Sequence, residues 1–135
     1  MIEYLLDTNI LSYFIRGRHP ALNSRVVEAL DRKTAGISAI VRAEMRFGQS
    51  GMQPHDMRHR AIDLLLDQLA TLPWTAAIAD AYGPLKSHLR SIGQPIGELD
   101  TQIGAHALAE GLILVTHNTR HFERIAGLKL EDWMG

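Results

Sequence analysis

The fold can be predicted from the stretch Ile2-Glu3-Tyr4-Leu5-Leu6-Asp7-Thr8-Asn9, which contains a buried strand and the acidic residue that follows it. Its core, Tyr4-Leu5-Leu6, is apolar without alternation, which is typical of a parallel-sheet strand buried on both faces. Asp7 follows directly, and open α/β sheets bind ligands at the carboxyl ends of their strands. Asp7 is therefore either a catalytic or metal-binding carboxylate or a helix cap. Because Thr8 and Asn9 are also good capping residues, the functional role is favoured.

Composition limits the class of protein. The chain has 135 residues, which suits one domain over residues 1–135, and 46% hydrophobic with 21% charged residues favours a folded core over disorder. There are no cysteines, which excludes disulfides and thiolate metal sites and fits a cytoplasmic protein. No run is long enough to span a membrane, and no export signal is evident. The net charge of -1 is not that of a strongly basic nucleic-acid-binding protein, so charge has to be considered locally.

Strands and helices are expected to alternate, which indicates an α/β domain with a mostly parallel central sheet flanked by helices. Strands are predicted at residues 4–6, 34–38, 71–74, 112–116 and 128–133. Helices are predicted at residues 9–15, 21–32, 39–47, 56–69, 75–92 and 99–110, with a bend or break at Gly83-Pro84 and a turn or short helix at 117–122.

Two carboxylates fall on helix faces that are otherwise apolar or small. Glu44 shares a face with Val41 and Phe47, and the face of Asp100 includes Ile103. A buried carboxylate without a partner costs several kcal/mol or raises its own pKa. Each therefore needs a partner, which is either a buried arginine, a helix N-terminus in the case of Asp100, or a cation.

Taken together, Asp7, Glu44 and Asp100 suggest one metal site, because one follows a strand and two face inward from helices. Oxygen ligands without cysteine suit a hard cation such as Mg²⁺ or Mn²⁺. An ion pair or a helix cap explains each carboxylate alone equally well.

The strand predicted at residues 112–116 should end at the same edge of the sheet. It brings Thr116, His117 and Asn118 toward the carboxylates. Thr116 and Asn118 either complete the strand end and a turn or hold metal-bound waters. His117 is the only histidine expected near the site, as a turn residue or a phosphate contact.

Four segments resemble, in order, the motifs of PIN-domain nucleases. They are Leu6-Asp7-Thr8-Asn9, the segment from Ser38 to Glu44, the segment from Gly93 through Asp100 to Ala107, and Val115-Thr116-His117-Asn118. Their order, spacing and length resemble the VapC-type toxins of bacterial toxin–antitoxin pairs over essentially the whole chain.

This resemblance implies an endoribonuclease that uses Mg²⁺ or Mn²⁺. Asp7, Glu44 and Asp100 match the acidic metal ligands of the family. The fourth position, acidic in many members, is Asn118 here, and Glu98 is a candidate replacement for the missing charge. The residues that would support these ligands are Thr8, Asn9 and Thr116.

An RNA substrate follows from the same resemblance, which points to tRNA and more particularly to the anticodon loop of the initiator tRNA. Phosphates would be held by local positive charge near the motifs. Ordinary solvated surface explains any single arginine equally well. The candidates are Arg16, Arg18, Arg42, Arg46 and Arg120.

The resemblance also implies a homodimer and a small VapB-like antitoxin whose C-terminal segment covers the early helices. Phe14, Ile15, Leu22 and Leu66 are candidates for an apolar groove that receives it, although core packing explains them equally well. The alternative to an enzyme is a PIN fold that binds RNA or antitoxin with weak or no catalysis. Its best support is the uncharged Asn118.

Overall fold

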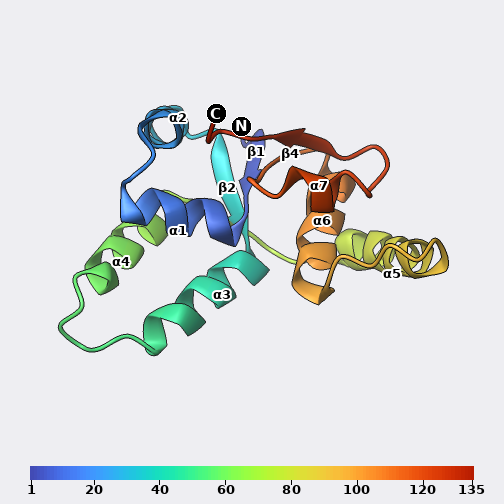
Figure 1. The fold of residues 1–135 in the computed structure, drawn as a ribbon, viewed down its shortest axis with the longest axis horizontal. Coiled ribbons are helices and arrows are strands. Elements are labelled where there is room, and N and C mark those ends of the chain that lie inside the picture. Colours follow the sequence, from blue (N-terminus) through green and yellow to red (C-terminus); the bar gives the residue numbers. More distant parts are fainter.

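The computed structural model describes residues 1–135 and confirms the α/β architecture, with a sheet that is parallel throughout (Figure 1). The five strands lie in the order β3-β2-β1-β4-β5. Tyr4 of β1 is paired with Ala35 of β2 on one side and with Ile113 of β4 on the other, so the first strand is the central one. The strands are β1 (Tyr4–Leu6), β2 (Ala35–Ser38), β3 (Ala70–Leu72), β4 (Ile113–Val115) and β5 (Lys129–Glu131).

Helices cover both faces of this sheet. Helices α1, α2 and α4 lie on one side, α5 and α6 lie on the other, and α3 projects from the carboxyl edge of β2 between them (Figure 1). No helix is both long enough and apolar enough to cross a bilayer. The helices are α1 (Thr8–Arg16), α2 (Pro20–Arg32), α3 (Ala39–Ser50), α4 (Arg58–Gln68), α5 (Ala76–Ser91), α6 (Glu98–Glu110) and α7 (Thr119–Phe122).

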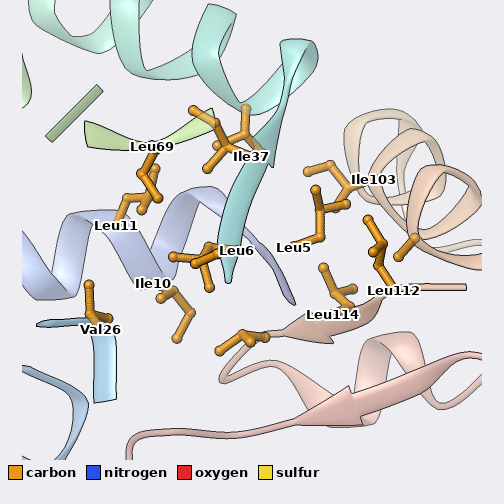
Figure 2. Packing of buried hydrophobic residues seen from close by; sticks show 14 of the residues in the cluster. Leu5, Leu6, Ile10, Leu11, Val26, Ile37, Leu69, Ile103, Leu112 and Leu114 are labelled. Carbon is orange, nitrogen blue, oxygen red and sulfur yellow. The ribbon is translucent and has the colours of Figure 1, made fainter. Parts of the chain in front are cut away.

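The central strand is buried on both faces, as its unbroken apolar run predicted. Leu5 and Leu6 are both inaccessible to solvent. Leu5 lies toward Ile103 of α6, whereas Leu6 lies toward Ile10 of α1 (Figure 2). Burial of one such side chain stabilises a fold by about 1.5–3 kcal/mol. The two leucines therefore fix β1 between the helix layers, and they fix the position of the residue that follows it, Asp7.

Two element boundaries differ from the sequence prediction for local reasons. β3 ends at Leu72, earlier than predicted, because Pro73 has no amide N–H to extend the ladder. α4 begins at Arg58, later than predicted. The Asp56 carboxylate accepts a hydrogen bond from the amide of Arg58 at 2.9 Å, so Asp56 precedes the helix and does not belong to it.

Two helices continue through residues that were expected to end or bend them. α3 runs on to Ser50, and α5 is not interrupted, although Pro84 lies inside it. The prediction that Phe47 faces inward was wrong, because its side chain is 82% exposed. The C-terminal half of α3 extends beyond the sheet (Figure 1), so it has no core to pack against on that side.

Candidate metal centre

A cleft at the carboxyl edge of the sheet collects the acidic residues. It has a volume of about 490 Å³, and four of its lining residues carry carboxylates, while none is basic. These acids come from the end of β1, from α3 and from the first turn of α6. Like charges in one cleft repel one another and favour a bound cation. The lining residues are Asp7, Thr8, Asn9, Glu44, Ile96, Gly97, Glu98, Leu99, Asp100 and Ile103.

Asp7 occupies the junction between β1 and α1, where it is only 5% exposed. Its Oδ1 atom accepts a hydrogen bond from the amide of Ile10 at 2.9 Å, so Asp7 itself is the N-cap of α1. The capping role, one of the two that the sequence left open for Asp7, is therefore present, and neither Thr8 nor Asn9 caps the helix. Instead the Thr8 hydroxyl donates to Oε1 of Glu44 at 2.7 Å, which ties α1 to α3 across the cleft.

The surroundings of Asp7 shift the pKa of its carboxyl. Burial raises the pKa of its carboxyl from 3.8 to about 6. Hydrogen bonds from the Thr116 hydroxyl and the Ile10 amide lower this pKa, and the negative charges of Asp100 and Glu44 raise it again. Thus the three predicted ligands lie near enough for their charges to act on one another. A divalent cation would relieve that repulsion.

The carboxylates share the cleft but do not converge on one point. No three acidic or histidine side chains are arranged to hold a single ion. Oδ2 of Asp100 lies 3.0 Å from Nδ1 of His121. Glu98 accepts hydrogen bonds from the Tyr82 hydroxyl and, at 2.6 Å, from Nζ of Lys86. The donor set fits a hard divalent cation in kind. One oxygen of Asp100 and both oxygens of Glu98 are engaged by these neighbours.

Asn118, the fourth predicted metal-binding residue, does not line the acid cleft. Asn118 is exposed and starts α7 without a side-chain capping bond. The backbone amide of Asn118 donates to the hydroxyl of Thr116 at 3.0 Å, and Thr116 is fully buried beside Asp7. Glu98, rather than Asn118, therefore joins Asp7, Glu44 and Asp100 at the cleft, as its fourth acidic side chain.

A histidine beside the acids is a residue that sequence reasoning missed. His117 was expected near the site, but it lies 3.0 Å from Asp132 and packs edge-on against Tyr13. His121 makes the contact with Asp100 instead. The direction of α7, which no local pattern specifies, turns this side chain toward α6.

Two of the five arginines proposed for phosphate binding are held elsewhere. Nη1 of Arg42 donates to the Thr71 hydroxyl at 3.0 Å, and Nη1 of Arg46 lies 2.6 Å from the Asp63 carboxylate. Both arginines thus attach α3 to neighbouring segments, and neither lines the cleft. The three that remain exposed are Arg16, Arg18 and Arg120.

The predicted apolar groove is only partly present. Leu22 and Leu66 belong to the buried core, so their assignment to an exposed groove was wrong, whereas Phe14 and Ile15 are partly exposed. A separate pocket of about 260 Å³ lies between α1, α3 and α4. Its apolar lining residues are Ile15, Met45, Met52 and Ile62, and Glu44 lines it as well as the acid cleft.

The fold and the acid cleft agree with a family comparison in which residues 4–128 match the PIN domain. The chain belongs to the PIN-domain family.

Similarity to individual proteins narrows this assignment to VapC-type members of the family. The chain is 36% identical over 130 residues to "Ribonuclease VapC1" of Haemophilus influenzae (strain R2866), covering 96% of this chain and 97% of that protein. It is 33% identical over 133 residues to "tRNA(fMet)-specific endonuclease VapC" of Shigella flexneri, covering 98% and 99%. A crystal structure of VapBC2 from Rickettsia felis, bound to a promoter DNA fragment, superposes with a TM-score of 0.88 at 34% identity and covers 98% of this chain and 99% of that one.

Proposed function

We propose that this chain is a toxin with metal-dependent endoribonuclease activity, which hydrolyses an RNA phosphodiester with Mg²⁺ or Mn²⁺ as cofactor. The observation that carries the proposal is the cleft lined by four carboxylates and no basic side chain. An RNA phosphate is itself anionic, so it can approach these acids only when cations neutralise them. The relative named a ribonuclease supports the same reaction class.

Asp7, Glu44 and Asp100 would hold the cation, with Glu98 as a fourth acid at the rim. A divalent cation bound there lowers the pKa of water and stabilises charge on the attacking and leaving oxygens of an in-line displacement. The chain supplies the positioning. The N-terminus of α1 holds the Asp7 carboxylate, the Thr8 hydroxyl holds one oxygen of Glu44, and His121 contacts Asp100.

The proposed substrate is tRNA, and more particularly the initiator tRNA. The Shigella flexneri relative is named for tRNA(fMet), and its similarity extends over 98% of this chain. Within such a molecule the anticodon loop is the proposed target, because a single-stranded loop lets a protein reach splayed bases and the backbone between them.

We also propose inhibition by a VapB-like antitoxin, supported by the VapBC2 assembly of the Rickettsia felis relative. A peptide helix laid in the pocket between α1, α3 and α4 would bury Ile15 and Met52 and would end beside Glu44. A basic side chain from that peptide would then reach the acid cleft. A homodimer is proposed with it, and the exposed side chains of Phe47 and Met57 are apolar surface that a partner would cover.

The test is cleavage of total tRNA by purified, partner-free protein in Mg²⁺ and in Mn²⁺, resolved on a gel. Discrete fragments that vanish with EDTA and in the Asp7→Asn variant would support the proposal. Normal cleavage by Asp7→Asn would refute the assignment of the site.

A second candidate function is an RNA- or antitoxin-binding module without catalysis. Two observations favour it, namely the uncharged Asn118 and the lack of convergence among the acids. It predicts RNA binding without fragments from folded wild-type protein in either metal.

A further inference from the structure

We propose that one face of α5 binds the RNA strand that leads into the acid cleft, an inference that rests on the proposed ribonuclease function. Tyr82, Lys86 and Arg90 follow one another at intervals of four residues, so they share one side of α5, about 6 Å apart along its axis. Trp74 packs edge-on against Tyr82, with ring centroids 6.0 Å apart. We call these four residues the α5 row. Aromatic rings beside cations are the composition of surfaces that bind single-stranded nucleic acid.

The α5 row is continuous with the candidate metal centre. Lys86 and Arg90 line a pocket of about 200 Å³ together with Gly97 and Glu98. Gly97 and Glu98 also line the acid cleft, so the two hollows share a wall. A backbone lying along α5, with its phosphates over Lys86 and Arg90, would therefore pass directly to the carboxylates.

The charge of Arg90 on this surface is available for a phosphate, whereas Lys86 is paired with a carboxylate. Arg90 is exposed and takes part in none of the ion pairs of the structure, which include one between Lys86 and Glu98 at 2.6 Å. Glu98 is the only carboxylate that lines the shared pocket. Asp80, also on α5, is half a turn away from Tyr82 and faces a different direction. This availability contrasts with Arg42 and Arg46, whose guanidinium groups are held by α4 and β3 neighbours.

The loop that supplies Pro95 and Gly97 to this pocket is held by hydrogen bonds and by burial. Nη1 of Arg124 donates to the carbonyl of Pro95 at 3.1 Å, the amide of Gln94 donates to the carbonyl of Leu89 at 2.9 Å, and Ile96 is buried. A surface that is ordered before binding loses less entropy when a ligand is bound.

The location of α5 leaves this surface open beside an antitoxin. α5 packs chiefly on α6, on the far side of α6 from α1 and α4 (Figure 1). The pocket proposed for the antitoxin peptide lies among α1, α3 and α4. A row of cations also suits an acidic peptide, but the Trp74–Tyr82 pair offers rings for base stacking and favours RNA.

RNA binding by the full chain is measured by fluorescence anisotropy of a labelled RNA, in EDTA so that no metal-dependent cleavage occurs. The probes are a fluorescein-labelled single-stranded oligoribonucleotide of mixed sequence and, as competitor, total tRNA. Arg90→Gln should weaken binding several-fold at low salt. It should also reduce the magnitude of the negative slope of log association constant against log salt concentration by about 0.7. The matched control is Arg60→Gln, which removes an exposed arginine on α4 and should leave affinity and slope unchanged. Trp74→Leu should weaken binding about tenfold without altering the slope.

The outcomes separate this inference from the proposed function. Suppose that the wild type cleaves tRNA and that Arg90→Gln has the same RNA affinity and salt slope as Arg60→Gln. The RNA-binding role of the α5 row would then be refuted, and the proposed ribonuclease function would stand. If the folded wild type neither bound nor cleaved RNA, both this inference and the proposed ribonuclease function would be overturned. If Arg90→Gln lost binding of a labelled poly-glutamate peptide but kept binding of RNA, the surface would belong to an acidic peptide and the inference would fail.

Discussion

Replacing Asp7 with asparagine should make the metal-free protein more stable while it abolishes the proposed activity. Asp7 is nearly completely buried, and its carboxylate lies under the influence of two other acids. Asparagine is as good an N-cap as aspartate, so the hydrogen bond from the Ile10 amide is retained. The substitution therefore removes an unfavourable buried charge and leaves the local backbone structure in place.

The size of the stability gain follows from the pKa of the Asp7 carboxyl. The Asp7 carboxyl titrates at about 6 in the folded chain, compared with 3.8 for its ordinary value. At about 1.4 kcal/mol for each pH unit, the ionised group costs the folded state on the order of 3 kcal/mol near neutral pH. Local relaxation reduces this cost, so we expect Asp7→Asn to raise the free energy of unfolding by about 2 kcal/mol. The melting temperature should rise by roughly 7 °C.

The effect has a defined pH dependence. Because the folded chain binds this proton more tightly than the unfolded chain, the wild type loses stability as pH rises from 3.8 to about 6, and the loss is complete above that range. The stability advantage of Asp7→Asn should therefore be largest near neutral pH and should disappear near pH 3.8. Asp7→Ala, which loses the cap as well, should gain about 1 kcal/mol less than Asp7→Asn.

Urea unfolding followed by circular dichroism in EDTA measures all three proteins across this pH range. Addition of Mg²⁺ should stabilise the wild type and not Asp7→Asn, since a ligand stabilises only the form that binds it. An Asp7→Asn variant that is no more stable than wild type near neutral pH would refute the electrostatic reasoning. A gain that did not shrink in acid would show that its cause is something other than the carboxylate charge.

Three further substitutions test other parts of the structure. His106→Leu should raise the free energy of unfolding by about 1 kcal/mol, because His106 is fully buried with neither ring nitrogen hydrogen-bonded. Burial lowers the pKa of His106, so in urea titrations the wild type should lose stability relative to the variant as pH falls below about 6.5. Thr8→Val should cost about 1 kcal/mol in thermal unfolding by deleting the hydrogen bond to Glu44, and Thr8→Ser should not. Phe47→Ser should alter stability by less than about 0.5 kcal/mol, since this side chain is exposed, and a larger loss would mean that it packs against the core.

The strands and the position of the first acid could be predicted because they depend on local signals. The apolar runs at Leu5-Leu6 and Leu114-Val115 are buried as their lack of alternation indicates. Asp7 follows the first run directly, so the end of the strand determines where it lies. Helical spacing also identified Glu44 and Asp100, because residues of one face stay together whatever the helix packs against.

The remaining features depend on contacts between distant segments. His121 contacts Asp100 only because Phe122 and Ile125 pack closely on α6, where a methyl group at Gly104 would overlap the Ile125 side chain. Periodicity places Phe47 on the face of Glu44, but it carries no information on where the sheet ends beneath α3. Likewise, the ion pair of Arg46 with Asp63 depends on how α3 and α4 lie against each other.

The strand order has a consequence for how such a chain is made. β1 is the first strand to be synthesised, yet one of its edges is covered only by β4, which lies near the C-terminal end of the chain. The acid cleft needs Asp7 from the start of the chain and Asp100 from the helix that precedes β4. A nascent chain therefore cannot assemble the cleft until the segment through β4 has left the ribosome. If the proposed function holds, a nuclease that attacks the RNA of translation stays inert while the segments that precede α6 are being synthesised.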